Sequence, residues 1–221
     1  MLDSIAIRLI EPAIKALAKP IKRWGISANQ LTVIGFLIGL LGAVSIAFHC
    51  YFFGLLLILF SRLLDALDGA VARLGQASDA GGFLDICLDF IFYASVPLSF
   101  AFANPAQNAL AAAVLLFSFI GTASSFLAFA ILAQKYKLSN VGLPKKSFYF
   151  LGGLTEATET LLFFILICLM PYYFNYLAYS FALLCSFTIV TRVYWGFTHL
   201  KAIEKHPSFF IQQQKKNHDE T

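Results

Sequence analysis

Apolar segments of about 20 residues recur along the whole chain, and they limit its possible folds more than any other feature. An α-helix rises about 1.5 Å per residue, so each segment can cross a hydrocarbon core about 30 Å thick. Of the 221 residues, 59% are hydrophobic and 13% are charged, whereas soluble domains are about one quarter charged. The sequence therefore predicts an all-α, polytopic membrane protein, with no room for a second folded domain.

Residues 1–24 predict an amphipathic, juxtamembrane helix that lies in the membrane interface. Apolar residues such as Leu2, Ile5 and Leu9 recur at helical spacing. Charged residues, Arg8 and Lys15 among them, interrupt the apolar run that a signal peptide would need. A basic end to such a helix suits anionic lipid headgroups.

The next 176 positions, residues 25–200, predict one domain of six transmembrane helices, and a polar cytosolic tail covers residues 201–221. Ser27 is the expected N-cap of the first span. A polar loop is expected at 134–152. The predicted spans are residues 28–48, 52–73, 82–103, 107–133, 153–170 and 173–200.

Lysine and arginine residues concentrate on one side of these spans. The three connections on the other side, near residues 49–51, 104–107 and 170–172, contain none. The positive-inside rule therefore predicts that both termini face the cytosol. The net charge of +4 is explained by topology and predicts no nucleic-acid partner.

Four aspartates flank one predicted cytosolic turn. Measured from the ends of the two helices, Asp68 and Asp85 lie about 6–7 Å deep, and Asp65 and Asp89 about 12 Å deep. Spacings of three and four residues place each pair on one helical face. If the two helices are antiparallel neighbours, all four carboxylates converge. Asp79, in the turn, is expected to be solvated.

Converging carboxylates in a low-dielectric site need compensating charge, because each buried acid costs at least about 2.5 kcal/mol. Hard oxygen ligands without thiols or imidazoles select Mg²⁺, Mn²⁺ or Ca²⁺. Two such ions would suit a phosphoryl displacement. Arg73 offers a fork for phosphate, and Arg62 is expected to pair with Asp65 or with a neighbouring helix. Beside the acids, Gly69 and Ala72 leave the helix thin enough for a flat nucleotide to lie against the backbone.

The stretch of residues 65–89 resembles the signature of the CDP-alcohol phosphatidyltransferase family. Seven residues separate Arg73 from Gly81, one fewer than in the signature, and the helical spacings are unchanged. Asn29 and Thr32 also match a recurring opening of the family's first span. The chain looks most similar to an uncharacterised branch of this family in the bacterial inner membrane. The signature positions are all filled here, by Asp65, Asp68, Gly69, Ala72, Arg73, Gly81, Asp85 and Asp89.

This resemblance implies transfer of the phosphatidyl group of CDP-diacylglycerol to a small polar alcohol, with release of CMP, in phospholipid biosynthesis (an EC 2.7.8 type reaction). It implies two ions, Mg²⁺ or Mn²⁺, a homodimer, and a cytosolic active site in the bacterial inner membrane. Asp89 would be both metal ligand and general base. The implied metal ligands are Asp65, Asp68, Asp85 and Asp89, and the implied CDP-binding residues are Asp65, Gly69, Ala72, Arg73 and Gly81.

The acceptor site leaves alternatives open. Lys145 and Lys146 could bind an acceptor phosphate or could only determine topology. Arg192, about 12 Å inside the last span, could bind the acceptor or could pair with Glu159 and lock two helices. Intramembrane acids and arginines also occur in ion or proton transporters, which is the alternative class, and a catalytically inactive family member is a third reading.

Overall fold

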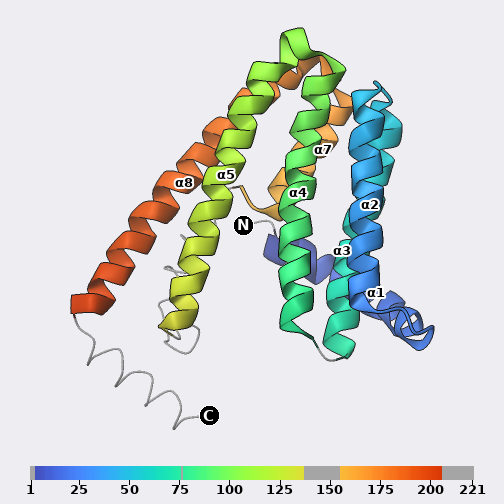
Figure 1. Ribbon diagram of the computed structural model, residues 1–221, viewed down its shortest axis with the longest axis vertical. Helices are drawn as coiled ribbons and strands as arrows, with labels where there is room; N and C mark the ends of the chain where they lie inside the picture. Colours follow the sequence, from blue (N-terminus) through green and yellow to red (C-terminus); the bar gives the residue numbers. More distant parts are fainter. Residues whose placement is uncertain (1–2, 76, 137–154, 206–221) are drawn as a thin grey trace. The chain divides into compact units, whose positions relative to one another are not determined.

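The structure of the protein, a computed structural model, describes residues 3–75, 77–136 and 155–205. Every regular element within these ranges is a helix, which confirms the predicted all-α class for this part of the chain (Figure 1). The elements are α1 (Asp3–Arg23), α2 (Ala28–Ala47), α3 (Tyr51–Leu74), α4 (Asp79–Ala103), α5 (Pro105–Lys135), α7 (Ala157–Leu169), the short 3₁₀ helix η2 (Pro171–Tyr173) and α8 (Phe174–Lys205).

Two helix starts follow from side-chain caps. The predicted N-cap Ser27 is confirmed, because it forms a reciprocal capping box with Gln30. The helix predicted at 82–103 begins earlier, at Asp79, because the Ser78 hydroxyl accepts a hydrogen bond from the Gly81 amide at 3.1 Å. Asp79 is therefore the exposed first residue of a helix rather than a turn residue.

The last two helices differ from prediction in length. The helix predicted at 153–170 begins at Ala157 and has 13 residues, and residues 153–154 lie outside the described part. The helix predicted at 173–200 continues to Lys205. Residues beyond 200 carry more polar side chains, but a helix does not need to stop where its apolar face ends.

Among the described residues, four helical segments are long and apolar enough to cross a membrane: α2, α4, α5 and residues 171–205, which comprise η2 and α8. Helix α3 has 24 residues but carries Arg62, Asp65, Asp68 and Arg73. Many large apolar side chains on these helices are exposed, Phe102 and Phe117 among them. A lipid environment tolerates such an exposed apolar surface, whereas water does not.

The chain divides into two compact units. The larger unit contains residues 2–116 and 157–181, and the smaller one contains the described residues among 117–156 and 182–221. In the smaller unit, the guanidinium of Arg192 donates to the carbonyl of Thr122 at 2.9 Å, and the hydroxyl of Thr155 donates to that of Thr188 at 3.1 Å. The candidate site lies wholly in the larger unit.

Helix α2 is the centre of the larger unit, with α3 and α4 both packed on it (Figure 1). Its glycines allow this close approach. At Gly39 a Cβ atom would lie 2.6 Å from the ring of Phe92 on α4. At Gly42 it would lie 3.0 Å from the carbonyl of Gly54 on α3. Ile46 and Ile58 are fully buried beside this second contact.

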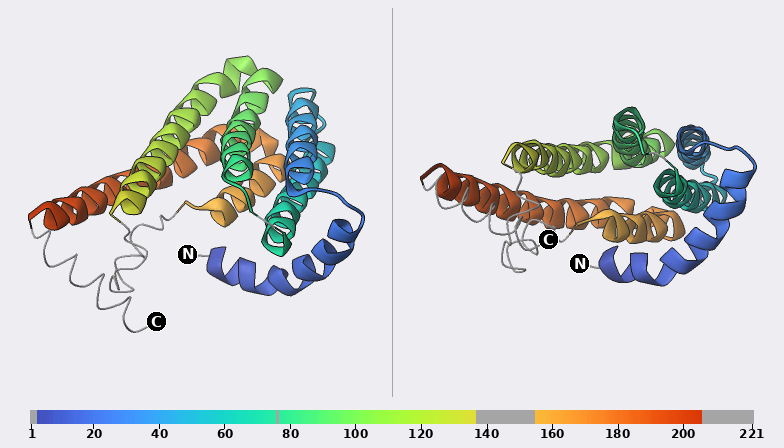
Figure 2. Two further views of the ribbon diagram at one scale, coloured as in Figure 1. Left: turned by 60° about the horizontal axis from the view of Figure 1, so that its bottom comes forward. Right: turned by 90° about the horizontal axis from the view of Figure 1, so that it is seen from below.

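Helix α1 curves along the ends of α3 and α7 (Figure 2). Pro12 and Pro20 lie inside it, and proline bends helices. Ile14 and Ala18 are buried in one cluster with apolar residues of α2 and α3, including Leu67. This contact fixes α1 against the end of α3 that carries the aspartates.

The contact between α2 and α3 predicts a large effect of one methyl group. In Gly54→Ala, the new Cβ would lie 2.7 Å from Ile46 Cγ1 and 2.8 Å from the Gly42 carbonyl oxygen. Overpacking of this kind costs about 1–3 kcal/mol, so thermal unfolding in detergent should shift to a lower temperature. Gly82→Ala is the matched control, because its Cβ would meet nothing within 4 Å. Equal unfolding temperatures for the two variants would contradict this packing.

Candidate metal centre

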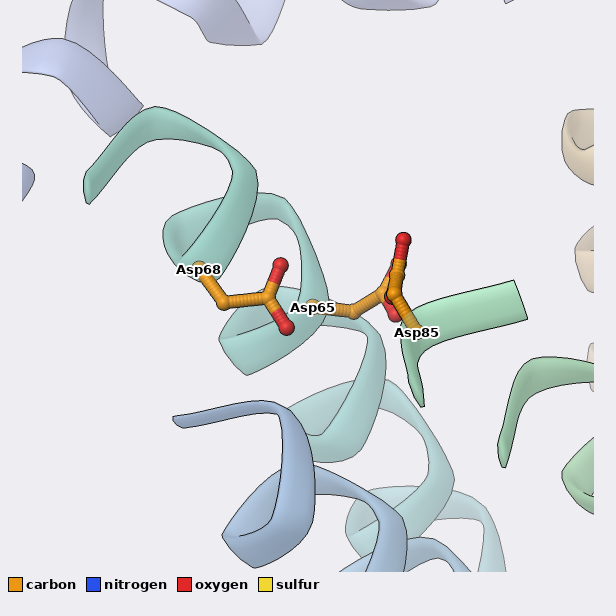
Figure 3. A group of neighbouring side chains, drawn as sticks. All are labelled: Asp65, Asp68 and Asp85. Atoms are coloured by element: carbon orange, nitrogen blue, oxygen red, sulfur yellow. The ribbon is translucent and has the colours of Figure 1, made fainter. Parts of the chain in front are cut away.

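Three carboxylates from α3 and α4 meet beside the turn that joins these helices. Asp65, Asp68 and Asp85 each offer an oxygen atom, and the three atoms lie within 4.8 Å of one another (Figure 3). Asp65 and Asp68 project from the same face of α3, because they are three residues apart. Asp85 reaches them from the second turn of α4.

One oxygen atom of this group lacks a hydrogen-bond partner among the described residues. Asp68 is only 6% exposed, and its buried Oδ2 atom has no hydrogen-bond partner among the described residues. A buried carboxylate oxygen without a donor is costly. Three hard oxygen ligands this close together fit a divalent cation such as Mg²⁺ or Mn²⁺, which would supply the missing positive charge. The type and spacing of these three ligands therefore suit a divalent metal centre.

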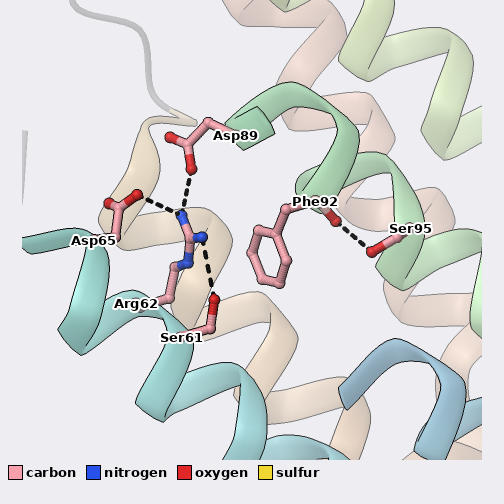
Figure 4. Close-up of polar contacts among 6 residues, drawn as sticks. All are labelled: Ser61, Arg62, Asp65, Asp89, Phe92 and Ser95. Carbon is pink, nitrogen blue, oxygen red and sulfur yellow. Dashed lines mark hydrogen bonds and ion pairs between the residues drawn. The ribbon is translucent and has the colours of Figure 1, made fainter. Parts of the chain in front are cut away.

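Asp89 lies apart from the three, in contact with Arg62. The Arg62 Nη1 atom donates to Asp89 Oδ1 at 2.5 Å and lies 3.5 Å from Asp65 Oδ1 (Figure 4). The sequence predicted that all four carboxylates converge. In the structure three of them form one group, and the fourth is linked to that group through the arginine.

A cleft that is open to solvent is lined by residues of both sets. Helix α2 supplies part of its wall. Sequence reasoning did not predict that Gly35 and Phe36 of this helix line the cleft. The available signal was the match of Thr32 to the family's first span, since residues one helical turn apart share a face. The residues that line the cleft are Thr32, Gly35, Phe36, Arg62, Asp65, Asp85, Leu88 and Asp89.

The predicted nucleotide-binding residues lie at the same end of α3 and α4. Gly69 has open space on its side-chain face: a Cβ there would meet only the Arg73 guanidinium, at 3.4 Å. Arg73 is exposed in the last turn of α3, and Ala72 beside it is half-buried. Gly81 is different, because its Cβ would lie 2.8 Å from Asn29 Oδ1. Its lack of a side chain allows the start of α4 to approach the start of α2.

The predicted acceptor residues belong to other parts of the chain. Lys145 and Lys146 lie outside the described residues. Arg192 is 7% exposed in the smaller unit, where the charge of Glu156 acts on it and its guanidinium lies 5.7 Å from the ring centre of Phe126. The alternative pair of Arg192 with Glu159 stays a prediction.

Residues 25–194 match the CDP-alcohol phosphatidyltransferase family. The match spans most of the chain and includes α2 to α4 with all four aspartates. The chain therefore belongs to the CDP-alcohol phosphatidyltransferase family, which confirms the resemblance seen in the sequence.

Individual relatives agree with this assignment. The chain is 50% identical over 205 residues to the inner membrane protein YnjF of Escherichia coli, covering 93% of this chain and 100% of YnjF. It is 38% identical to archaetidylinositol phosphate synthase of Pyrococcus horikoshii over 97 residues, 43% of this chain and 51% of that protein.

The fold is similar to solved structures of the phosphatidylinositol phosphate synthase PgsA1 of Mycobacterium tuberculosis. A structure of PgsA1 with manganese and citrate aligns with a TM-score of 0.62 at 20% identity, over 84% of this chain and 89% of that one. A structure with CDP-DAG bound aligns with a TM-score of 0.59 at 20% identity, over 84% and 94%. At this identity the similarity shows the shared fold.

The geometry predicts that Mn²⁺ stabilises the protein through these carboxylates. At 100 times its dissociation constant, a ligand of the folded state adds about 2.7 kcal/mol of stability. Mn²⁺ should therefore raise the unfolding temperature of the wild type but not that of Asp85→Asn. In EDTA, Asp85→Asn should be at least as stable as the wild type, because it removes like-charge repulsion.

The matched control is Asp79→Asn, which removes an exposed carboxylate from the first turn of the same helix. It should keep the full Mn²⁺ response. An equal Mn²⁺ response in Asp85→Asn and Asp79→Asn would exclude Asp85 as a ligand.

Proposed function

We propose that this protein transfers the phosphatidyl group of CDP-diacylglycerol to a small polar alcohol and releases CMP, as a step of phospholipid biosynthesis. The observation that carries the proposal is the group of three carboxylates around the buried, unpartnered oxygen of Asp68. Membership of the family and the fold shared with PgsA1, a structure of which has CDP-DAG bound, support it.

Asp65, Asp68 and Asp85 would hold the metal, with two ions, Mg²⁺ or Mn²⁺, as the working stoichiometry and Asp89 as a further ligand. When bound, the ions would neutralise the donor pyrophosphate and stabilise the charge that develops on it. A PgsA1 structure in complex with manganese supports a divalent ion at this fold. The protein's part is to fix the carboxylates in place before the substrate arrives.

The remaining signature residues would orient the nucleotide. The open face of Gly69 and Ala72 gives a flat group access to the backbone of α3, and the exposed guanidinium of Arg73 can form paired hydrogen bonds with phosphate. Asp65 would contact the nucleotide as well as the metal. Gly81 would contribute by keeping the start of α4 close to α2, so that the nucleotide site stays narrow.

Asp89 would accept the proton of the attacking hydroxyl group. Its carboxylate lies on α4 one turn beyond Asp85 and lines the same cleft. The alcohol oxygen would form a bond to the lipid-side phosphorus, the bond from that phosphorus to the CMP oxygen would break, and the hydroxyl proton would pass to Asp89. Transfer from Asp89 to water would then complete the cycle.

The same proposal places the chain in the bacterial inner membrane as a multi-pass homodimer. In the part of the chain that the structure describes, four helical segments meet the length and apolarity of a span, and YnjF is an inner membrane protein. Six spans in residues 25–200 follow if α3 and the short α7 also cross. Helix α1 would lie in the interface as an amphipathic helix, with its buried Ile14 and Ala18 toward the core and its lysines toward lipid headgroups. Both termini and the site would then face the cytosol.

A direct assay tests the reaction. Purified protein in detergent should release CMP from radiolabelled CDP-diacylglycerol when supplied with Mg²⁺ or Mn²⁺ and a panel of polar alcohols and phospho-alcohols. EDTA should abolish the release, because the carboxylates alone cannot neutralise the pyrophosphate. An ion or proton transporter, or an inactive family member, would release no CMP under any of these conditions.

Substitution of Asp89 tests its role as a base. Asp89→Asn should lower turnover by about 10²–10⁴-fold, which is the usual contribution of general acid–base catalysis. Asp79→Asn, which alters an exposed acid of the same helix, should keep wild-type turnover. Near-normal turnover in Asp89→Asn would remove Asp89 from the role of base.

Binding of the acceptor is one of the two roles that the sequence leaves open for Arg192. Arg192→Ala should then raise the KM for a phospho-alcohol such as glycerol 3-phosphate by about 10-fold or more, because a charge-assisted hydrogen bond contributes about 1.5–3 kcal/mol. Unchanged kinetics with a lower unfolding temperature would instead assign Arg192 to the structural role that its bond to the Thr122 carbonyl already suggests.

A further inference from the structure

Arg62 is a positive charge built into the acidic site. Its side chain is 11% exposed, it lines the cleft, and it touches two of the four aspartates. The Nη1 atom makes the 2.5 Å contact with Asp89 and the longer contact, 3.5 Å, with Asp65 (Figure 4). The family signature has no position for this arginine, which lies three residues before its first aspartate.

The guanidinium is held in one place by its neighbours. Its central carbon lies 4.0 Å from the ring centre of Phe92, which is fully buried on α4. A cation over an aromatic face is attracted to it. The Nη2 atom donates to the buried hydroxyl of Ser61 at 3.3 Å. Gly39 of α2 brings both groups close, since a Cβ there would lie 2.6 Å from Phe92 and 2.8 Å from Ser61 Oγ.

The contacts of Arg62 are not those of a fully satisfied structural ion pair. Its buried Nε atom has no hydrogen-bond partner among the described residues. A buried pair stabilises a fold only when its remaining donors are also satisfied. Arg62 instead directs its strongest contact to Asp89, the one carboxylate that lies outside the three-membered group.

We infer that Arg62 is a positioning residue which, before metal binds, holds Asp89 apart from the other three aspartates, and which a divalent cation must partly displace from Asp65. The inference rests on the proposed function, because it assigns Asp89 and Asp65 their roles in that reaction. Arg62 lowers the electrostatic repulsion in the acidic site before metal binds, and it orients Asp89 as a base while the other three carboxylates bind the first ion. The consequence is an affinity for metal lower than four free carboxylates would give.

Mn²⁺ binding to the full-length protein in detergent, without lipid substrate, tests this directly. Arg62→Gln removes a positive charge beside two carboxylates. A positive charge at this distance ordinarily weakens the binding of a proton to a carboxylate by about 10-fold or more. The same repulsion acts on a divalent cation. Mn²⁺ should therefore bind at least about 10-fold more tightly to Arg62→Gln, while turnover falls because Asp89 is no longer held. A purely structural arginine would lower stability and leave Mn²⁺ affinity unchanged.

Two further variants keep the test decisive. Arg62→Lys retains the charge but loses the planar fork, so its Mn²⁺ affinity should lie between those of the wild type and Arg62→Gln. It also serves alone if Arg62→Gln does not fold. Arg23→Gln is the matched control, because it removes an exposed arginine of α1, and its Mn²⁺ affinity should equal that of the wild type.

The outcomes separate this inference from the proposed function. Equal Mn²⁺ affinities in the wild type and every folded Arg62 variant would overturn the role of Arg62, whatever their turnover. A wild type that binds Mn²⁺ but releases no CMP with any alcohol would overturn the proposed reaction, and the order of Mn²⁺ affinities would still decide the role of Arg62.

Discussion

The repulsion among carboxylates that lie close together in a partly buried site is the constraint on which the rest of the structure depends. One carboxylate oxygen each of Asp65, Asp68 and Asp85 lies within 4.8 Å of the other two. Asp68 also has a buried oxygen without a hydrogen-bond partner among the described residues. Such a group persists only if positive charge is near. One resident cation, Arg62, meets part of this need, and the donor set fits a divalent ion for the remainder.

The close packing of α2 makes this arrangement possible. Small residues on α2 let both neighbours approach: a Cβ at Gly35 would lie 3.2 Å from Leu64 of α3, and one at Gly39 would lie 2.6 Å from Phe92 of α4. Because α3 and α4 both pack on α2, their polar side chains reach each other across the cleft that α2 closes. The glycines of α2 thus determine where the carboxylates of the candidate site lie.

Local sequence rules predicted the parts of the molecule that depend on local geometry. The cap at Ser27 and the shared face of Asp65 and Asp68 follow from residue spacing alone. The partner of Asp89 did not follow, because it depends on the rotamer of one arginine and on the ring that supports it. The early start of α4 was missed because hydropathy does not report a serine cap such as Ser78.

Family membership and the individual chain explain different features of the site. The signature accounts for the four aspartates and the proposed nucleotide-binding residues, so it accounts for the proposed class of reaction. It does not contain Arg62, Ser61 or Phe92, and these residues decide which carboxylate stays away from the others. A site of four equivalent acids would bind cations tightly but would hold no single carboxylate in the orientation that accepts a proton. Holding one of them on an arginine divides the four acids between the two tasks that the proposed reaction needs.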